Sequence, residues 1–310
     1  MAVIATGFFD GVHLGHRLVT DTLLKVARER GEQSVIVTFW PHPRTVLQDD
    51  ARSLRLLSSF QEKKSLLLGL GVDRVEVLDF SREFSRLTAE QYLRDYVQGR
   101  FGGTAIVLGY DNRLGSDRLC PEEISPLASS LGLDVINVPP VPVFCGPEEN
   151  CSPSGVNVAT SISSTKIRAA LEKGDVQGAA AMLGYRYGLH GVVISGNQLG
   201  RTIGFPTANM QLYDPLKLIP ANGVYLVEVE TLGSHYYGMT NIGVKPTVSG
   251  AGVRTIETHI FDFDELIYGL DIRVRFIDRI REERRFSSLD ALRDQLTADR
   301  DLCGSMIGRL

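Results

Sequence analysis

The chain has 310 residues, a net charge of −4 and 43% hydrophobic residues, which are ordinary values for a folded globular protein. This length favours about two domains, and the hydrophobic content excludes a mainly disordered chain. Lys and Arg are spread along the sequence, so we expect no nucleic-acid partner, although a local basic pocket for a phosphate is compatible with the composition. We expect a monomer or a weak homo-oligomer.

The sequence shows no sign of export, of a membrane span or of a structural metal site. Its first residues lack the basic stretch and the long apolar run of a signal peptide, and no segment approaches the ~20 apolar residues that a span requires. Because the cysteines have no CxxC spacing, we expect reduced thiols in a cytoplasmic protein rather than a disulfide or a zinc site. The four are Cys120, Cys145, Cys151 and Cys303.

The first 184 residues alternate short apolar runs with amphipathic stretches. The runs predict five strands, at Val3–Phe9, Ser34–Trp40, Arg74–Phe80, Ala105–Tyr110 and Asp134–Val138. The stretches between them have helical spacing; the first carries Val19, Leu23, Val26 and Ala27 on one face, and others lie near Phe60–Leu70, Thr88–Val97 and Cys120–Leu131. The alternation predicts an α/β domain whose parallel sheet binds ligands at the carboxyl ends of its strands.

The middle of the chain marks the passage to a second domain. Pro139–Ser161 is rich in Pro, Gly, Ser and Asn and predicts a long loop. Two helices follow, Ser164–Gly174 with a hydroxyl cap and a terminal glycine, and Val176–Leu183. We place the boundary near residues 183–188, which gives domains 1–184 and 185–310.

Beyond Tyr185 the sequence predicts an antiparallel β-barrel with a terminal helix. The only helical pattern there runs from about Leu289 to Met306, with Ser287 or Ser288 as its cap. Strand-like runs joined by Gly, Pro and Asn turns fill the rest of this half. They are His190–Ser195, Val224–Glu230, His235–Ile242, Thr255–Asp262 and Ile272–Ile280.

The most informative segment follows the first predicted strand and reads Gly-Phe-Phe-Asp-Gly-Val-His-Leu-Gly-His from Gly7 to His16. Its glycines let the backbone approach a phosphate, and the start of the next helix supplies free N–H groups. His13 and His16 can donate hydrogen bonds to oxygens that gain charge when an α-phosphate is attacked. The alternative is that both histidines merely cap the helix. We predict a phosphate site that contains Gly7, Phe9, Asp10, Gly11, His13, Gly15 and His16.

A second cationic segment opens the helix that begins at Ser164. Lys166 and Arg168 lie in its first turn, where positive charge opposes the helix dipole. Two cations in such an unfavourable place suggest that they face an anion, although these residues alone leave a structural role equally open. The hydroxyl groups of Ser164 and Thr165 join them as candidate phosphate ligands.

The second domain carries its own phosphate motif, Gly-Asn-Gln-Leu-Gly-Arg-Thr-Ile-Gly-Phe-Pro-Thr-Ala-Asn, which ends at Asn209. The glycines at positions 196, 200 and 204 would let a loop lie against a nucleotide, although turns in β domains are often rich in glycine. Thr207 and Asn209 offer two oxygen ligands that suit Mg²⁺. We therefore predict Gly196, Gly200 and Gly204 as residues that contact the nucleotide phosphates.

A carboxylate on a later predicted strand is the candidate base of this domain. If Ile256 packs inward, Glu257 and His259 project from the opposite face. An exposed glutamate on a strand is usually a solvated surface charge, and we expect His259 to be structural. Glu257 alone therefore does not establish a catalytic site.

These motifs together resemble the prokaryotic bifunctional riboflavin kinase/FAD synthetases. The His-x-Gly-His run is the signature of nucleotidylyltransferases, and Gly-x-Pro-Thr-Ala-Asn is that of riboflavin kinases. The resemblance covers essentially the whole chain and includes Phe39–Arg44, Leu57–Lys63 and Gly109–Gly115. It implies a Rossmann-like nucleotidylyltransferase domain followed by a riboflavin kinase barrel.

The resemblance also implies roles for individual residues. ATP phosphates would contact His13, His16, Lys166 and Arg168. Thr207 and Asn209 would hold Mg²⁺, and Glu257 would take the proton of the ribityl 5′-hydroxyl. The flavin would lie near Pro41, His42 and Pro43, which by themselves suggest an ordinary turn, and near Asp111, Asn112 and Arg281.

Four positions depart from the pattern of that family. The family usually has an aromatic residue at Asn112, a phenylalanine at Leu114, a smaller residue at Phe8 and an arginine at Lys245. We expect the first three changes to touch pocket walls and so to affect flavin affinity more than catalysis. Lys245 keeps the positive charge but loses the planar fork of arginine.

The leading hypothesis is an enzyme with two ATP sites. It would phosphorylate riboflavin to FMN and then adenylylate FMN to FAD with release of pyrophosphate, using ATP and Mg²⁺. A second hypothesis keeps only one nucleotidylyl transfer, with the barrel as an accessory. A third is a flavin-binding sensor without catalysis, which only the departures at Asn112, Leu114 and Lys245 favour.

Overall fold

The computed structural model describes residues 1–47, 54–143, 160–196, 198–245 and 253–309. The predicted Cys145 and Cys151 thiols and most of the predicted loop Pro139–Ser161 lie outside these residues, as does the side chain of Lys245. The chain divides into two compact units, Met1–Ser164 and Thr165–Leu310. None of the helices within the described part of the chain combines the length and apolar content needed to cross a bilayer.

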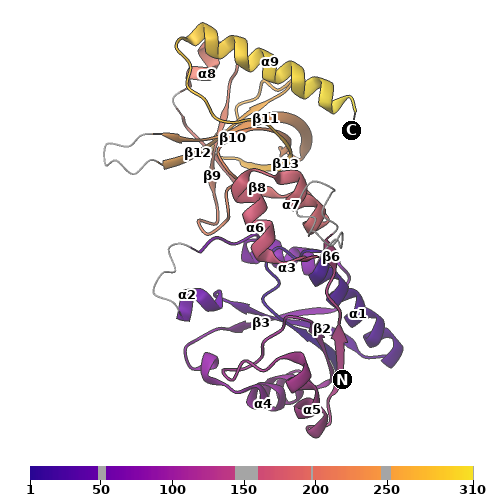
Figure 1. Cartoon of the computed structure of the whole chain (residues 1–310). Helices are drawn as coiled ribbons and strands as arrows, with labels where there is room; N and C mark the ends of the chain where they lie inside the picture. The colour runs from indigo at the N-terminus through magenta and orange to yellow at the C-terminus, as the bar shows by residue number, and fades with distance from the viewer. Residues whose placement is uncertain (48–53, 144–159, 197, 246–252, 310) are drawn as a thin grey trace, which may run out of the picture. The chain divides into compact units, whose positions relative to one another are not determined.

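The first unit is built on a parallel sheet of five strands in the order β3-β2-β1-β4-β5 (Figure 1). Every predicted strand is present, although the first ends at Thr6, three residues earlier than predicted, because the chain turns away at Gly7. The strands are β1 (Ala2–Thr6), β2 (Gln33–Trp40), β3 (Arg74–Asp79), β4 (Gly103–Gly109) and β5 (Asp134–Val138). The predicted parallel α/β domain is therefore confirmed.

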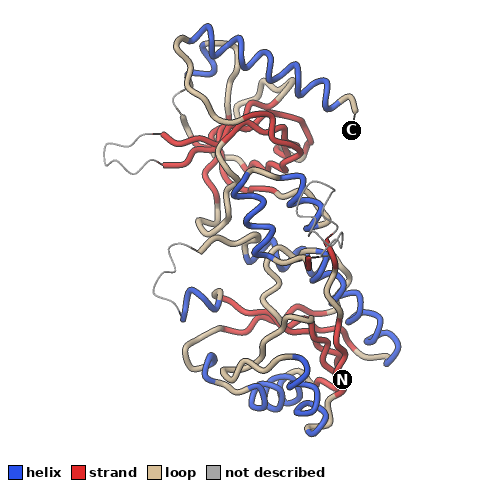
Figure 2. The backbone as a smooth tube through the Cα atoms, in the orientation of Figure 1, coloured by secondary structure: helices blue, strands red, loops and turns tan. Residues whose placement is uncertain are grey.

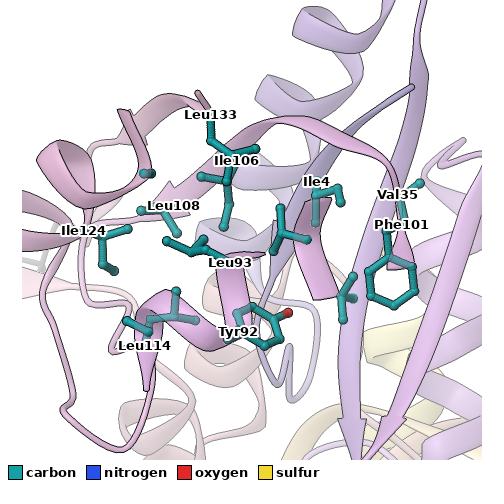
Figure 3. Packing of buried hydrophobic residues seen from close by; sticks show 14 of the residues in the cluster. Ile4, Val35, Tyr92, Leu93, Phe101, Ile106, Leu108, Leu114, Ile124 and Leu133 are labelled. Atoms are coloured by element: carbon teal, nitrogen blue, oxygen red, sulfur yellow. The ribbon is translucent and has the colours of Figure 1, made fainter. Parts of the chain in front are cut away.

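Helices cover both faces of this sheet (Figures 1 and 2). One face packs against α1 (Leu14–Arg30) and α3 (Phe60–Gly69) through a cluster that includes Leu23 and Leu67. The other packs against the segment 89–100 and α5 (Pro121–Ser130), with Leu93, Ile106 and Ile124 at its centre (Figure 3). Burial on both faces explains why the three central strands, β1, β2 and β4, have largely apolar sequences.

The remaining elements of the first unit are short. The predicted helix Thr88–Val97 is divided into α4 (Ala89–Gln91) and a π-helical segment, η3 (Tyr92–Arg100). Its start was correctly predicted from Thr88, whose side chain accepts from Gln91 N in a capping box. Four elements have no counterpart in the sequence prediction: α2 (Pro43–Leu47), η2 (Phe84–Arg86), β6 (Pro142–Val143) and β7 (Thr160–Ser161).

The second unit is a closed antiparallel barrel in the order β10-β11-β12-β9-β8-β13. It begins with the helices α6 (Ser164–Lys173, whose first residue belongs to the first unit) and α7 (Val176–Leu183). The strands are β8 (Gly188–Ile194), β9 (Ala208–Leu212), β10 (Gly223–Thr231), β11 (Ser234–Lys245), β12 (Val253–Ile260) and β13 (Asp271–Arg281). The barrel was predicted from five of these strands, and the sixth is β9.

A terminal helix, α9 (Leu289–Ile307), packs on the outside of the barrel (yellow in Figure 1). Ser288 caps it by accepting from Ala291 N, as one of the two predicted alternatives requires. Cys303 of α9 is buried in a cluster with Val224, Leu226 and Met239 on the outer face of the barrel. The barrel interior is a separate layer, in which the hydroxyl groups of Thr240 and Thr258 hydrogen-bond at 2.8 Å.

Candidate active sites

The first candidate site lies where the strand order of the parallel sheet reverses. The segment after β1 and the segment after β4 both leave the carboxyl edge of the sheet at adjacent strands. Asn112 joins the two segments, because its side-chain amide donates to the carbonyl oxygen of Thr6 at 3.0 Å. Such a reversal point is where open α/β sheets bind their ligands.

The turn after β1 has an unusual backbone. Phe9, Gly11 and Val12 have φ of 55°, 78° and 39°, and positive φ is costly for a β-branched side chain such as that of Val12. Phe9 and Val12 are also buried, which fixes the turn from within. Strain of this kind persists only where the surroundings hold it, and it is concentrated at functional sites.

Asp10 is the side chain that supports this turn. It is 3% exposed, and its carboxylate accepts from the backbone N–H groups of Leu57 and Ser58 at 3.0–3.1 Å. The Ser58 hydroxyl in turn accepts from Gly11 N at 3.0 Å. We predicted from the sequence that Asp10 is part of the phosphate site. In the structure its carboxylate is hydrogen-bonded to Leu57 and Ser58 and so stabilises the turn.

The two histidines stack on each other at the start of α1. Their ring centroids are 3.6 Å apart, and the His16 ring also meets the edge of Phe9 at 5.2 Å. Gly15 permits this packing, because a Cβ there would lie 3.1 Å from the His13 ring. His13 does cap the helix, since its Nδ1 accepts from His16 N at 3.4 Å, so the alternative of simple capping accounts for one of the two histidines.

His16 is held in its neutral form. Burial lowers its pKa well below the ordinary value, and the charges of His13 and Lys63 lower that pKa further. Its Nδ1 is buried and has no hydrogen-bond partner among the described residues, and buried polar atoms are rarely left in that state. A neutral imidazole can still donate one N–H to a ligand oxygen.

The predicted flavin residues lie along the same edge of the sheet. Pro41 and His42 follow β2, and Pro43 begins α2. The His42 ring meets the Phe8 ring edge-on at 4.1 Å, so this segment contacts the turn after β1. Asp111 is exposed beyond β4.

The expectation that Leu114 forms a pocket wall is wrong. Leu114 is 7% exposed and packs in the cluster of Leu108 and Ile124 beneath the sheet (Figure 3). A leucine where the family has phenylalanine is therefore a change in core packing. The other departure on this segment, Asn112, links the ends of β1 and β4 by the bond described above.

The predicted cations of α6 fall at the division between the two units. Ser164 ends the first unit, and its hydroxyl donates to the carbonyl oxygen of Asp10 at 3.0 Å. Thr165, Lys166 and Arg168 belong to the second unit. Their participation in the histidine site stays a prediction.

The second candidate site begins at the glycine-rich loop of the barrel unit. A Cβ at Gly196 would lie 2.3 Å from the Asn209 side-chain nitrogen, and one at Gly200 would lie 2.2 Å from the carbonyl oxygen of Phe205. The loop therefore lies directly against the Pro-Thr-Ala-Asn segment. It contains a short helix absent from the prediction, α8 (Leu199–Thr202), and Gly204 ends the loop with φ of 85°.

The strand register places three polar side chains in one row. Asn209 of β9 lies opposite Glu257 of β12, and Glu257 lies opposite Asn241 of β11. Ile256 is buried and Glu257 is half-buried on the opposite face, which is the alternation expected from the sequence. Side chains directly opposite on neighbouring strands have Cβ atoms about 4.5–5.5 Å apart, so Asn209 and Glu257 are within reach of one bound group.

A cavity of about 100 Å³ opens beside Thr207. It is closed on one side by the segment 263–268 and on the other by the glycine-rich loop. Arg201 of α8 is its only lysine or arginine among the described residues. Sequence reasoning missed Arg201 and Asn241, because neither stands out until the loop and the register bring them to the motif.

Two other residues of this region have structural contacts. The Nδ1–H of His259 donates to the carbonyl oxygen of Pro206 at 2.8 Å. Burial lowers the pKa of His259, so a neutral imidazole holds the turn before Thr207. Arg281 forms an ion pair with Asp299 of α9, Nη2 to Oδ2 at 2.8 Å. If Arg281 contacts the flavin as predicted, it does so with a guanidinium that also pairs with Asp299 and connects α9 to the barrel.

Two family models match the chain. The one described as FAD synthetase matches residues 1–148, and the one described as riboflavin kinase matches residues 183–307. The bifunctional riboflavin kinase/FMN adenylyltransferase of Bacillus subtilis is 34% identical over 96% of this chain and 90% of its own length. That of Escherichia coli K12 is 36% identical with the same coverage. The chain belongs to the bifunctional riboflavin kinase/FMN adenylyltransferase family.

A solved structure has the same fold over nearly the whole chain. The crystal structure titled as a macrolide-efflux protein from Streptococcus pneumoniae is 35% identical, with a TM-score of 0.86, and covers 97% of this chain and 93% of its own. The activity in that title is said of that protein. For this member of the family, the two family models coincide with the two candidate sites, one in each unit.

Proposed function

We propose that this chain phosphorylates riboflavin with ATP to FMN and then adenylylates FMN with ATP to FAD. The observation that carries the proposal is that two phosphate-handling arrangements lie in different units. One is the pair of stacked histidines at a helix start, and the other is Asn209 opposite Glu257, with Thr207, two residues before Asn209, lining a cavity. Membership in the family and its full-length relatives support both steps.

In the adenylyl-transfer site, an FMN phosphate oxygen would attack the α-phosphorus of ATP in line and release pyrophosphate. The turn at Gly7–Gly11 and the start of α1 would bind the phosphates through backbone N–H groups. His13 and His16 would donate hydrogen bonds to oxygens that gain charge in the transition state. Lys166 and Arg168 would add positive charge, and Pro41–Pro43 with Asp111 would border the flavin.

In the kinase site, Glu257 would take the proton of the riboflavin 5′-hydroxyl as its oxygen attacks the γ-phosphorus and ADP leaves. The register supports this role, because Glu257 lies opposite Asn209 in the strand row. The cavity beside Thr207 would take the terminal phosphates of ATP, and Arg201 would face them. Asn241, on the other side of Glu257, would contact the ribityl chain or the base itself.

Thr207 and Asn209 fit a magnesium site. Their side chains offer the neutral oxygens that Mg²⁺ accepts when phosphates and water complete its shell. Thr207 borders the cavity, and Asn209 lies beside Glu257. The ion would neutralise phosphate charge at the γ-phosphate that these residues flank.

We further propose functional domains 1–184 and 185–310, in a cytoplasmic enzyme without nucleic-acid or membrane partners. The family models support this boundary, because one ends at residue 148 and the other begins at 183. The compact units divide earlier, after Ser164. The difference concerns residues 165–184, which contain most of α6 and all of α7.

One experiment tests the whole assignment. The purified chain is incubated with riboflavin, ATP and Mg²⁺, and FMN and FAD are separated by chromatography. We expect FMN to appear first and FAD to follow. Flavin binding without either product would contradict the proposal and favour a sensor, and FAD formation only from supplied FMN would favour a single nucleotidylyl transfer.

A further inference from the structure

Lys63 is a buried cation that none of the proposed steps uses. Its side chain lies on α3 and is 2% exposed. Burying a lysine ammonium costs free energy unless hydrogen bonds and charges compensate it. The contacts of the Lys63 ammonium therefore indicate its role in the protein.

The ammonium group binds the two segments that border the first site. Its Nζ donates to the carbonyl oxygen of Phe8 and to the hydroxyl of Thr38, each at 3.0 Å, and lies 3.5 Å from the carbonyl oxygen of Phe39. The Thr38 hydroxyl also donates to Phe8 O at 3.2 Å. One buried side chain thus connects the turn after β1 with the end of β2.

The Lys63 ammonium also contacts the Phe8 ring, which in turn contacts the segment proposed to border the flavin. Lys63 Nζ lies 3.8 Å from the centroid of that ring, and the ring meets His42 edge-on at 4.1 Å. A cation at this distance from an aromatic face is attracted to it, more strongly where water is excluded. Phe8, where the family has a smaller residue, is therefore held between Lys63 and the proposed flavin segment.

Lys63 interacts electrostatically with Asp10 and with His16. Asp10 acts on Lys63 and partly offsets the effect of burial, which lowers the lysine pKa to about 8. Lys63 and His13 act on His16, whose pKa burial and these two groups lower. A cation beside His16 disfavours a second positive charge there.

We propose that Lys63 is a positioning residue for adenylyl transfer, which holds the turn after β1 in place by binding the carbonyl oxygen and ring of Phe8 and the hydroxyl of Thr38. The inference rests on the proposed role of the histidine site. In this arrangement the lysine contacts no reacting atom. It fixes the geometry of the turn that leads from β1 into the histidine site.

The test is Lys63→Met, with Lys64→Met as its control. Methionine fills a similar volume without charge, and Lys64 is the exposed neighbour on the same helix. We expect Lys63→Met to lower kcat/KM for FMN adenylylation by about 10- to 100-fold, as small misplacements of catalytic groups do. Riboflavin phosphorylation by the same chain should be unchanged, and Lys64→Met should match the wild type in both reactions.

A second readout separates positioning from a merely structural role. Removing the positive charge should raise the pKa of His16, although burial still holds that pKa below its ordinary value, and ¹⁵N NMR of the imidazole measures the change. The acid limb of the adenylylation pH profile should move to higher pH for the same reason. Adenylylation equal to that of Lys64→Met would overturn the proposal, as would a loss of activity with an unchanged His16 pKa.

A second variant tests the same contacts without removing the buried lysine. Thr38→Val keeps the volume of the side chain but removes the hydroxyl that accepts from Lys63 and donates to Phe8 O, so it should lower FMN adenylylation and leave riboflavin phosphorylation unchanged. Wild-type adenylylation by Thr38→Val would overturn the inference. A failure of the proposed function has a different signature, because His16→Ala would then keep full adenylylation whatever Lys63 does.

Discussion

At the scale of single residues, the molecule separates side chains that would meet substrate from side chains that hold them. His16 belongs to the first group, since it is half-buried, its lowered pKa favours the neutral imidazole, and its buried Nδ1 has no hydrogen-bond partner among the described residues. Asp10 belongs to the second, because backbone N–H groups occupy its carboxylate. The two lie within one ten-residue motif, so a motif alone does not distinguish the roles.

His16→Ala should abolish most FAD formation while FMN accumulates. Losing one donor to a developing negative charge costs about 10²- to 10³-fold in rate. Chromatography of products from riboflavin and ATP measures both steps in one mixture, so the kinase reaction serves as the internal control. Loss of both activities in a folded variant would contradict the assignment of two sites.

Glu257→Gln should have the opposite effect. The amide keeps the shape of the side chain but cannot take a proton, and loss of a general base lowers rates by about 10²- to 10⁴-fold. Supplied FMN should still be converted to FAD at the wild-type rate. Full riboflavin phosphorylation by this variant would leave Glu257 as a surface charge.

The histidine also predicts how stability depends on pH. The His16 pKa is lowered in the folded state, so the unfolded chain binds a proton first as pH falls below about 6.5. Folding stability should therefore decrease below that pH, by at most about 1.4 kcal/mol per pH unit from this group. Urea unfolding of the wild type and of His16→Ala between pH 7 and 5 measures the difference, and equal slopes would contradict the assigned shift.

At the scale of secondary structure, the terminal helix depends on one buried ion pair. Asp299 of α9 is 2% exposed and pairs with Arg281 of β13. It also accepts from Gln295 of the same helix. The pair therefore connects α9 to the barrel at a place from which water is largely excluded.

Arg281→Met should destabilise the barrel unit by about 3–5 kcal/mol, because it leaves a buried carboxylate without its partner. Arg293→Met is the matched control, since the Arg293–Asp290 pair is more than half exposed and should contribute at most about 1 kcal/mol. Thermal unfolding measures both. Unchanged stability with weaker flavin binding would instead support the role that the family resemblance implies for Arg281.

At the scale of the whole molecule, the functional domains and the compact units do not divide at the same residue. Lys166 and Arg168 lie in the barrel unit by contact, yet the sequence predicts that they serve the histidine site. Lys166→Met should therefore lower FMN adenylylation by about tenfold or more, as removal of a charge-assisted phosphate contact does, and leave riboflavin phosphorylation intact. Lys173→Met, an exposed lysine on the same helix, is the control, and equal behaviour of the two variants would remove Lys166 from the site.

The sequence by itself determined the class of each half and the positions of most elements. Alternating apolar runs and helical spacing predicted the parallel sheet, because burial on both faces of a strand leaves a continuous apolar pattern. Turn residues and runs with a period of two predicted the barrel, because an antiparallel strand with one buried face alternates apolar and polar side chains. The His-x-Gly-His and Pro-Thr-Ala-Asn motifs were readable because the chemistry lies within a few consecutive residues.

Only the tertiary structure decided which distant residues meet. It placed Leu114 in the core, committed Asp10 to Leu57 and Ser58, and paired Glu257 with Asn209 and Asn241. It also buried Lys63 beneath Phe8, which no local pattern marks as unusual on an amphipathic helix. Strand register and helix packing are set by the sum of many weak long-range contacts, and no short segment of sequence carries that information.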